Sequence, residues 1–225
     1  MHIEPGVLAA AKIAGANAAA LGVVAVAAAL ALRQPAQLLR ALLAAMFFTL
    51  CMQSFHLKVG PSELHFIGAM PMYLVFGLVP TLLGFALGLA LQGLLFEPAD
   101  LLHLAVNTLS LSLPLLAVHA AFGRRLRRVN LRAVLQLDAA FYAGVTLMVG
   151  LWLSIGEVAT PLAEWLRFAA SYIAIVAIEP LITVMLVLGV SRLRAQRERF
   201  EAAQVDQAAQ ARRGIDGLEV VVAAQ

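Results

Sequence analysis

The stretch that decides the fold is FIGAMPMYLVFGLVPTLLGFALGLALQGLLF, residues 66–96, which contains no Asp, Glu, Lys or Arg. A bilayer core of about 30 Å needs roughly 20 apolar residues per helix, so this stretch is too long for one crossing. Gly77 and Pro80 offer a break inside it. The sequence therefore predicts two short helices here, joined by a tight turn.

The rest of the chain has the same apolar character. Of the 225 residues, 62% are hydrophobic and 13% are charged, and the mean hydropathy is +0.90. Soluble domains are about 45–50% apolar and about 25% charged. Apolar runs predict further spans at 6–32, 41–55, 103–122, 134–156 and 168–190, and the third span begins near His65. We predict an all-α, polytopic membrane bundle of about seven transmembrane helices over residues 1–190, with a polar tail over 191–225.

Basic residues gather in three of the segments that connect or follow the predicted spans. Under the positive-inside rule these segments are cytoplasmic. With seven spans, the amino terminus is then outside and the tail is cytoplasmic. The arginine bias suggests a GC-rich bacterium, so we expect the bacterial inner membrane; lipid is the expected partner and nucleic acid is not. The residues are Arg33 and Arg40, then Arg124, Arg125, Arg127, Arg128 and Arg132, then Arg192, Arg194, Arg197 and Arg199.

Small residues and the lone cysteine bear on packing and processing. Gly84 and Gly88 form a GxxxG step, and a small-residue stripe runs along the first span at Ala11, Gly15 and Ala19. Such steps let helices approach closely, and packing within the chain is favoured over homodimerisation.

The single Cys51 can form no internal disulfide. The opening MHIEPG lacks the basic start of a signal peptide, so Met1 is expected to be the mature terminus.

Polar side chains inside predicted spans are candidates for function, because lipid offers them no partner. His103, Asn107 and Ser110 share one helix face, as do Tyr172, Glu179 and Thr183. We expect Glu179 to be protonated or hydrogen-bonded inside the bundle. Two interpretations stay open: a role in transport, or capping of the backbone gap that Pro180 opens.

Other polar residues favour structural roles. Asp138 follows the arginine-rich segment and is expected to pair with one of its arginines. His119 is expected to lie at the membrane interface. Cys51 and nearby methionines could form a soft Cu(I) path, although their spacing favours ordinary packing.

The predicted outer side collects a different set of groups. The set is Met1, His2, Glu4, Glu63, His65, His103 and Asn107. A free α-amine, the amide nitrogen of residue 2 and the Nδ1 of His2 can close adjacent five- and six-membered chelate rings around one ion. One further imidazole completes a square-planar set of four nitrogens. This geometry suits Ni(II) or Cu(II), and Co(II) to a lesser degree, and it is poor for Mg(II) or Ca(II).

Five motifs in register resemble one family. The opening Met1-His2-Ile3-x-x-Gly6 resembles the M-H-I-x-x-G-F start of the CbiM/NikM family, the substrate-capture membrane subunits of cobalt and nickel energy-coupling-factor transporters. The other four follow in chain order over most of the membrane part: GPSELH at 60–65, LQGLLF at 91–96, Val106-Asn107, and EPLIT at 179–183.

The resemblance implies a seven-helix subunit that captures Ni(II) or Co(II) and has no catalytic cofactor. It implies the Met1 amine, the His2 amide and imidazole, and His65 as metal ligands. Asn107 would orient a ligand, and we add His103 and Glu63 to this supporting set. Departures such as Pro5 and Val7 leave the identity of the metal open.

Energy must come from partners, because the sequence has no GxxxxGK[ST] motif and the chain is predicted not to be an enzyme. The resemblance implies a transmembrane coupling subunit, a pair of ATP-binding-cassette ATPases and a small accessory membrane subunit. Two rival functions stay open. One is a redox protein with haem held by His103 and His119, and the other is a membrane scaffold whose metal site has decayed.

Overall fold

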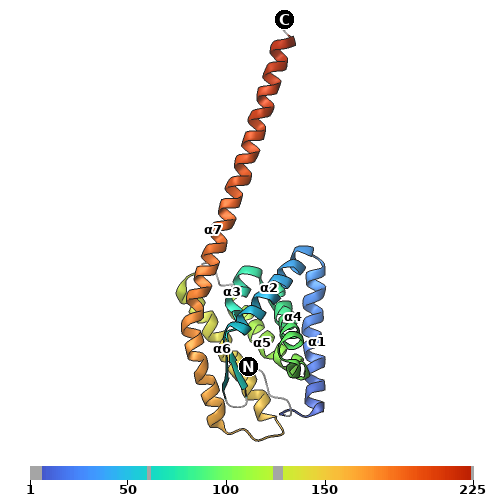
Figure 1. Cartoon of the computed structure of the whole chain (residues 1–225), viewed down its shortest axis with the longest axis vertical. Helices are drawn as coiled ribbons and strands as arrows, with labels where there is room; N and C mark the ends of the chain where they lie inside the picture. Colours follow the sequence, from blue (N-terminus) through green and yellow to red (C-terminus); the bar gives the residue numbers. More distant parts are fainter. Residues whose placement is uncertain (1–6, 60–61, 124–128, 224–225) are drawn as a thin grey trace. The chain divides into compact units, whose positions relative to one another are not determined.

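The computed structural model describes residues 7–59, 62–123 and 129–223, and for 205–223 it describes the backbone alone. Seven α-helices and a two-stranded hairpin make up the described chain (Figure 1). The predicted all-α class with about seven helices is confirmed, whereas the hairpin was not predicted. The elements are α1 (Ala10–Leu32), α2 (Pro35–Ser54), β1 (His56–Val59), β2 (Ser62–His65), α3 (Ala69–Phe76), α4 (Leu78–Leu95), α5 (Leu104–Val118), α6 (Leu131–Ser154) and α7 (Leu162–Ala223).

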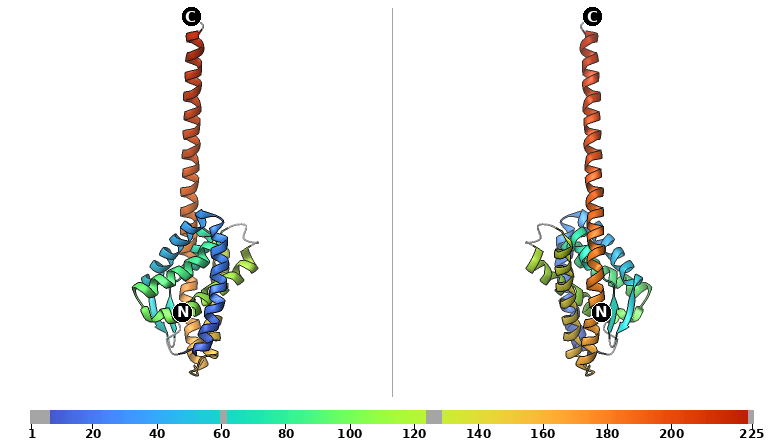
Figure 2. Two further views of the ribbon diagram at one scale, coloured as in Figure 1. Left: turned by 90° about the vertical axis from the view of Figure 1, so that its right-hand side faces the viewer. Right: turned by 90° about the vertical axis from the view of Figure 1, so that its left-hand side faces the viewer.

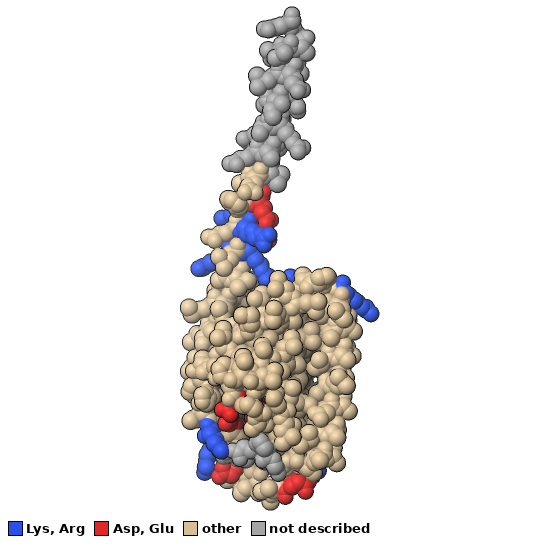
Figure 3. Space-filling view, turned by 45° about the vertical axis from the view of Figure 1, so that its right-hand side comes forward, with Lys and Arg blue, Asp and Glu red and all other residues tan. Residues whose placement is uncertain are grey.

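Six helices in the described residues are long and apolar enough to cross a membrane. They are α1, α2, α4, α5 with the 3₁₀ and π turns that flank it, α6, and the part of α7 up to Gln204. Figure 3 shows a broad uncharged band on the face drawn, with acidic side chains gathered toward one end of it. The protein is therefore a multi-pass membrane protein, as predicted.

The central stretch differs from its prediction in one respect. The break at Gly77 is confirmed, and this glycine has φ 93°, a backbone conformation that favours glycine. The predicted third span is wrong as a full-length helix, because α3 has eight residues and extends about 12 Å. The hairpin precedes it, and α3 is the helix that lies where the third span was predicted. The orientation of the termini remains a prediction.

Glycines bring α4 against α2. A Cβ added at Gly84 would lie 2.7 Å from the Cβ of Ala44, and one added at Gly88 would lie 2.5 Å from Cδ1 of Phe48. Both distances are shorter than a van der Waals contact, so only glycine allows this approach. The GxxxG step thus packs within the chain, as the sequence favoured.

The small-residue stripe predicted on α1 is wrong. Ala11, Gly15 and Ala19 are exposed, and a Cβ added at Gly15 would meet nothing within 4 Å. The buried positions of α1 are Ala16, Ala20, Ala27 and Ala31. Because alanine occurs on every side of this helix, the sequence offered no contrast that would select the packed face.

The chain divides into two compact units, Met1–Val184 and Met185–Gln225, and each is described by itself. The second unit is the carboxyl-terminal part of α7, which stays helical to Ala223. Its described side chains after Val190 are exposed. Arg197 Nε and Glu201 Oε1 form an i,i+4 ion pair at 2.7 Å. The division into a membrane domain and a tail at residue 190 stays a prediction.

Candidate metal centre

The hairpin presents the histidine that the sequence selected. β1 and β2 pair antiparallel, with His56 opposite His65 and Lys58 opposite Glu63. The Phe66 N–H donates to the Phe55 carbonyl at 3.2 Å, which extends the pairing by one step. The hairpin lies in the half of the bundle in which α1 begins (Figure 1 and Figure 2).

His65 is a buried imidazole at the end of β2. Its exposed fraction is 4%, whereas His56 on the opposing strand is exposed. The two rings stack with centroids 6.2 Å apart. The Glu63 Oε2 lies 3.4 Å from the His65 Nε2. A carboxylate at this position can hold one ring nitrogen, so that the other faces a metal ion.

The remaining predicted ligands, Met1 and His2, lie outside the described residues. The described chain begins against the connection between α6 and α7. The Glu157 N–H donates to the Val7 carbonyl at 2.7 Å, and Lys12 Nζ lies 2.6 Å from the Glu157 carboxylate. Residue 7 is therefore attached to the bundle at this connection.

The predicted polar face of α5 points into the bundle. His103, Asn107 and Ser110 are all buried, with exposed fractions of at most 1%. Ser110 has a structural partner, because its Oγ accepts the Trp152 Nε1–H from α6 at 2.9 Å. The supporting role of His103 and Asn107 toward a ligand stays a prediction.

The haem pair proposed as a rival does not fit the helix. His103 and His119 flank opposite ends of α5, which spans about 22 Å at 1.5 Å per residue. The His119 Nδ1 is instead hydrogen-bonded to the Tyr73 hydroxyl at 2.7 Å. These two histidines are too far apart to bind one iron.

The polar face of α7 is also buried, as predicted, and Glu179 is hydrogen-bonded. Its Oε1 accepts the Met70 N–H at 3.4 Å, and its Oε2 accepts the hydroxyl of Tyr142. The sequence did not single out Tyr142. The signal was its position four residues after Asp138, on one face of an apolar helix.

The predicted pairing of Asp138 with an arginine is not found for Arg132, and Arg124, Arg125, Arg127 and Arg128 lie outside the described residues. The Asp138 side chain is fully buried, and its carboxyl lies beside that of Glu179. Neither Asp138 oxygen has a hydrogen-bond partner among the described residues. Burial on the inner face of α6 keeps it away from the exposed Arg132.

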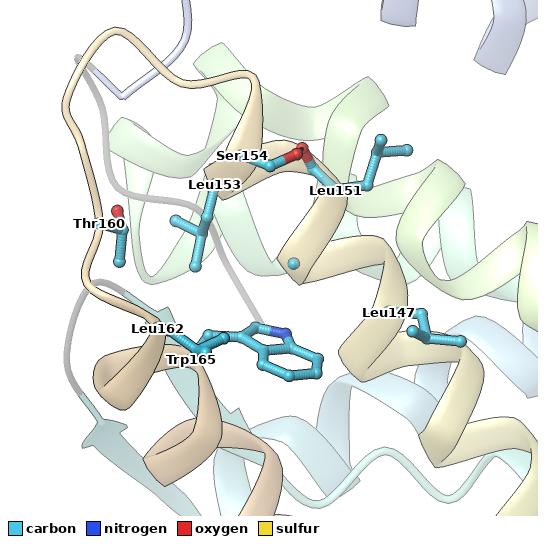
Figure 4. A pocket seen from close by; sticks show the side chains of 8 residues that line it. Leu147, Leu151, Leu153, Ser154, Thr160, Leu162 and Trp165 are labelled. Atoms are coloured by element: carbon cyan, nitrogen blue, oxygen red, sulfur yellow. Dashed lines mark hydrogen bonds between the residues drawn. The ribbon is translucent and has the colours of Figure 1, made fainter.

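The described residues hold no group of three or more His, Cys, Asp or Glu that would by itself bind a metal ion. They contribute two buried imidazoles, His65 and His103, so any site of four nitrogens needs donors from elsewhere. A hollow of about 400 Å³ near the end of α6 offers no such donors. Figure 4 shows leucines and Trp165 around it, and Trp165 Nε1 donates to the Thr146 carbonyl at 2.8 Å.

Comparison with known proteins identifies the family of this chain. The family model described as "Cobalt uptake substrate-specific transmembrane region" (CbiM) matches residues 2–197. The chain belongs to the CbiM family. Members are substrate-specific membrane components of transport, which agrees with the predicted non-enzymatic role. No curated protein matches this CbiM member.

Two solved structures share its fold. One, described as a transition metal transporter, has TM-score 0.61 and 21% identity, with 88% of this chain and 94% of that chain covered. The other, described as a truncated transition metal transporter, has TM-score 0.64 and 20% identity, with 87% and 99% covered. At this identity the likeness establishes the fold alone.

Proposed function

We propose that this CbiM member captures Ni(II) or Co(II) from the outer face of a bacterial inner membrane for import. The ligands are the Met1 amine, the amide nitrogen and Nδ1 of His2, and the His65 imidazole. The observation that carries the proposal is the burial of His65 at the end of β2, beside Glu63. A buried imidazole held by a carboxylate is a favourable transition-metal ligand.

The chemistry of the proposed ligands favours these metals. Four nitrogens in a plane suit Ni(II) or Co(II) better than hard cations such as Mg(II). Deprotonation of the His2 amide releases a proton, so affinity falls as the pH is lowered. Geometry must supply the selectivity, because the Irving–Williams order otherwise favours copper.

Metal entry to the cytoplasm requires energy from other chains. The sequence contains no GxxxxGK[ST] motif. We propose that a transmembrane coupling subunit and a pair of ATP-binding-cassette ATPases drive release, with a small accessory membrane subunit. Co-purification of the ATPases with this chain, and ATP-dependent uptake by proteoliposomes that contain the complex, would support the assignment.

Metal titration of the purified full-length chain tests the site. With its natural start intact, the protein should bind one Ni(II) or Co(II) per chain, measured by calorimetry and elemental analysis. A tag fused ahead of Met1 should abolish binding, because it removes the primary amine; His2→Ala and His65→Ala should do the same. His56→Ala is the matched control, because His56 faces His65 across the hairpin but is exposed.

The opposite result separates the alternatives. If the tagged chain and the His65→Ala variant bind the metal as tightly as the parent, the proposed ligand set is wrong. The membrane-scaffold interpretation, or an unrelated metal site, then replaces it.

A further inference from the structure

Glu179 is a buried side chain in the interior of α7 whose oxygens face several hydrogen-bond donors. The side chain is 0% exposed. Besides the Met70 N–H and the Tyr142 hydroxyl, the N–H groups of Gly68 and Ala69 also face its oxygens. A carboxyl group has about four lone-pair sites, and several of them face N–H groups at the start of α3. Glu179 is therefore directed at the start of this helix, with the Asp138 carboxyl beside it.

The donors identify what Glu179 does: it caps α3. The N-cap residue of this helix is Gly68, which has φ 65°. Because glycine has no side chain, it cannot accept a hydrogen bond from the first N–H groups of the helix. The first N–H groups of a helix have no partner within it, and lipid or a packed bundle supplies none. A side-chain carboxyl from a distant helix satisfies them, and its acceptor oxygens are favourable at this end of the helix dipole.

The capped end of α3 is close in sequence to the proposed metal ligand. Residues 66–68 alone separate His65 from α3. The backbone N–H of His65 faces the Tyr172 hydroxyl, and the Tyr172 ring stacks on Tyr142 with centroids 4.9 Å apart. Side chains of α7 thus reach this segment at His65 and at the start of α3.

We propose that Glu179 is a positioning residue for metal capture, which fixes His65 through the amino terminus of α3 and the hydroxyl of Tyr142. The inference rests on the proposed function, because it takes His65 to be a metal ligand. Flat four-nitrogen coordination tolerates little displacement of the fourth nitrogen. Loss of the cap frees residues 66–68 and lets the imidazole move out of the plane.

Substitution of Glu179 tests this in the full chain with its natural start. Ni(II) affinity is measured by titration, and the coordination plane by the visible absorption bands of the bound Ni(II). Glu179→Leu should lower the affinity about 10- to 100-fold, the range found when a group that orients a ligand is removed. It should also shift the absorption bands, because they respond to the position of the fourth nitrogen.

Matched variants separate positioning from folding. Thr183→Val is the control, because Thr183 is fully buried one turn further along α7 and its hydroxyl has no hydrogen-bond partner among the described residues. It should leave affinity and spectrum unchanged. Glu179→Gln keeps one oxygen acceptor and should restore part of the affinity. If Glu179→Leu does not fold, Tyr142→Phe removes a single hydrogen bond and should produce the same spectral shift, with a smaller loss of affinity.

The outcomes distinguish this inference from the proposed function. If Glu179→Leu or Tyr142→Phe lowers only the melting temperature, with affinity and spectrum equal to the parent, the positioning role is overturned. If His65→Ala loses Ni(II) in the same experiment, the proposed function stands without it. If His65→Ala also binds as tightly as the parent, both are overturned.

Discussion

His65 and Glu63 differ in how far their side chains are exposed to water. The imidazole is buried, whereas the side chain of Glu63 is 38% exposed. Water therefore screens the pair on one side, and its strength is closer to that of a surface ion pair than of a buried one. Glu63 therefore has a modest effect on the orientation of the His65 ring, whereas burial of His65 keeps competing water away from that ring.

A charge-neutral substitution measures this contribution. Glu63→Gln should weaken Ni(II) binding by at most about fivefold, since an exposed ion pair contributes about 1 kcal/mol or less. Calorimetric titration at low and high salt is the measurement, and the difference from the parent should shrink at high salt. A loss as large as that of His65→Ala would mean that Glu63 is itself a ligand.

Packing between elements depends on where small residues meet a neighbour. α2 and α4 approach closely through Gly84 and Gly88, whereas the glycines of α1 meet open space. The same residue type therefore has opposite consequences on two helices. The sequence spacing GxxxG indicates close approach, but only a facing helix makes that spacing matter.

Alanine at Gly88 should destabilise the bundle. The added Cβ would overlap Phe48 and approach the Ala45 carbonyl to 3.1 Å, and overpacking of this kind costs about 1–3 kcal/mol. Thermal unfolding in detergent should show a lower midpoint for Gly88→Ala. Gly22→Ala is the control, because its Cβ would meet nothing within 4 Å. Equal midpoints for the two variants would contradict the packing described.

The predicted orientation of the whole chain in the membrane depends on the charges of its connections and on the number of spans. Arg33 follows α1 and Arg40 lies near the start of α2, and Glu97 lies in the connection after α4. The positive-inside rule predicts opposite sides for them. Six described helices are long enough to cross a membrane, so the predicted sides also require a passage through the segment that contains α3, and this stays a prediction.

Thiol labelling of intact cells measures this orientation. In a Cys51→Ala background, Glu97→Cys should react with a membrane-impermeant maleimide added outside, because Glu97 is exposed on the predicted outer side. Arg33→Cys should react only after the membrane is opened. Labelling of Arg33→Cys in intact cells would reverse the predicted orientation.

The membrane class, the helices and the break at Gly77 follow from the sequence alone. They are local properties, because in lipid each backbone group of a helix must be paired within that helix. A run of about 20 apolar residues is therefore enough to predict a membrane-spanning helix. The burial of Glu179 and of the polar face of α5 followed from the same reasoning. The motifs that resemble the family also lie in the sequence.

Only the tertiary structure decided what satisfies the remaining polar groups. The strands His56–Val59 and Ser62–His65 are too short for a periodic signal, and α3 forms where a full span was predicted. The partner of Glu179 is the start of α3, 109 residues away along the chain, and the Asp138 carboxyl also lies beside Glu179. A buried donor and its acceptor need only meet in space, so their pairing leaves no spacing in the sequence by which to find it.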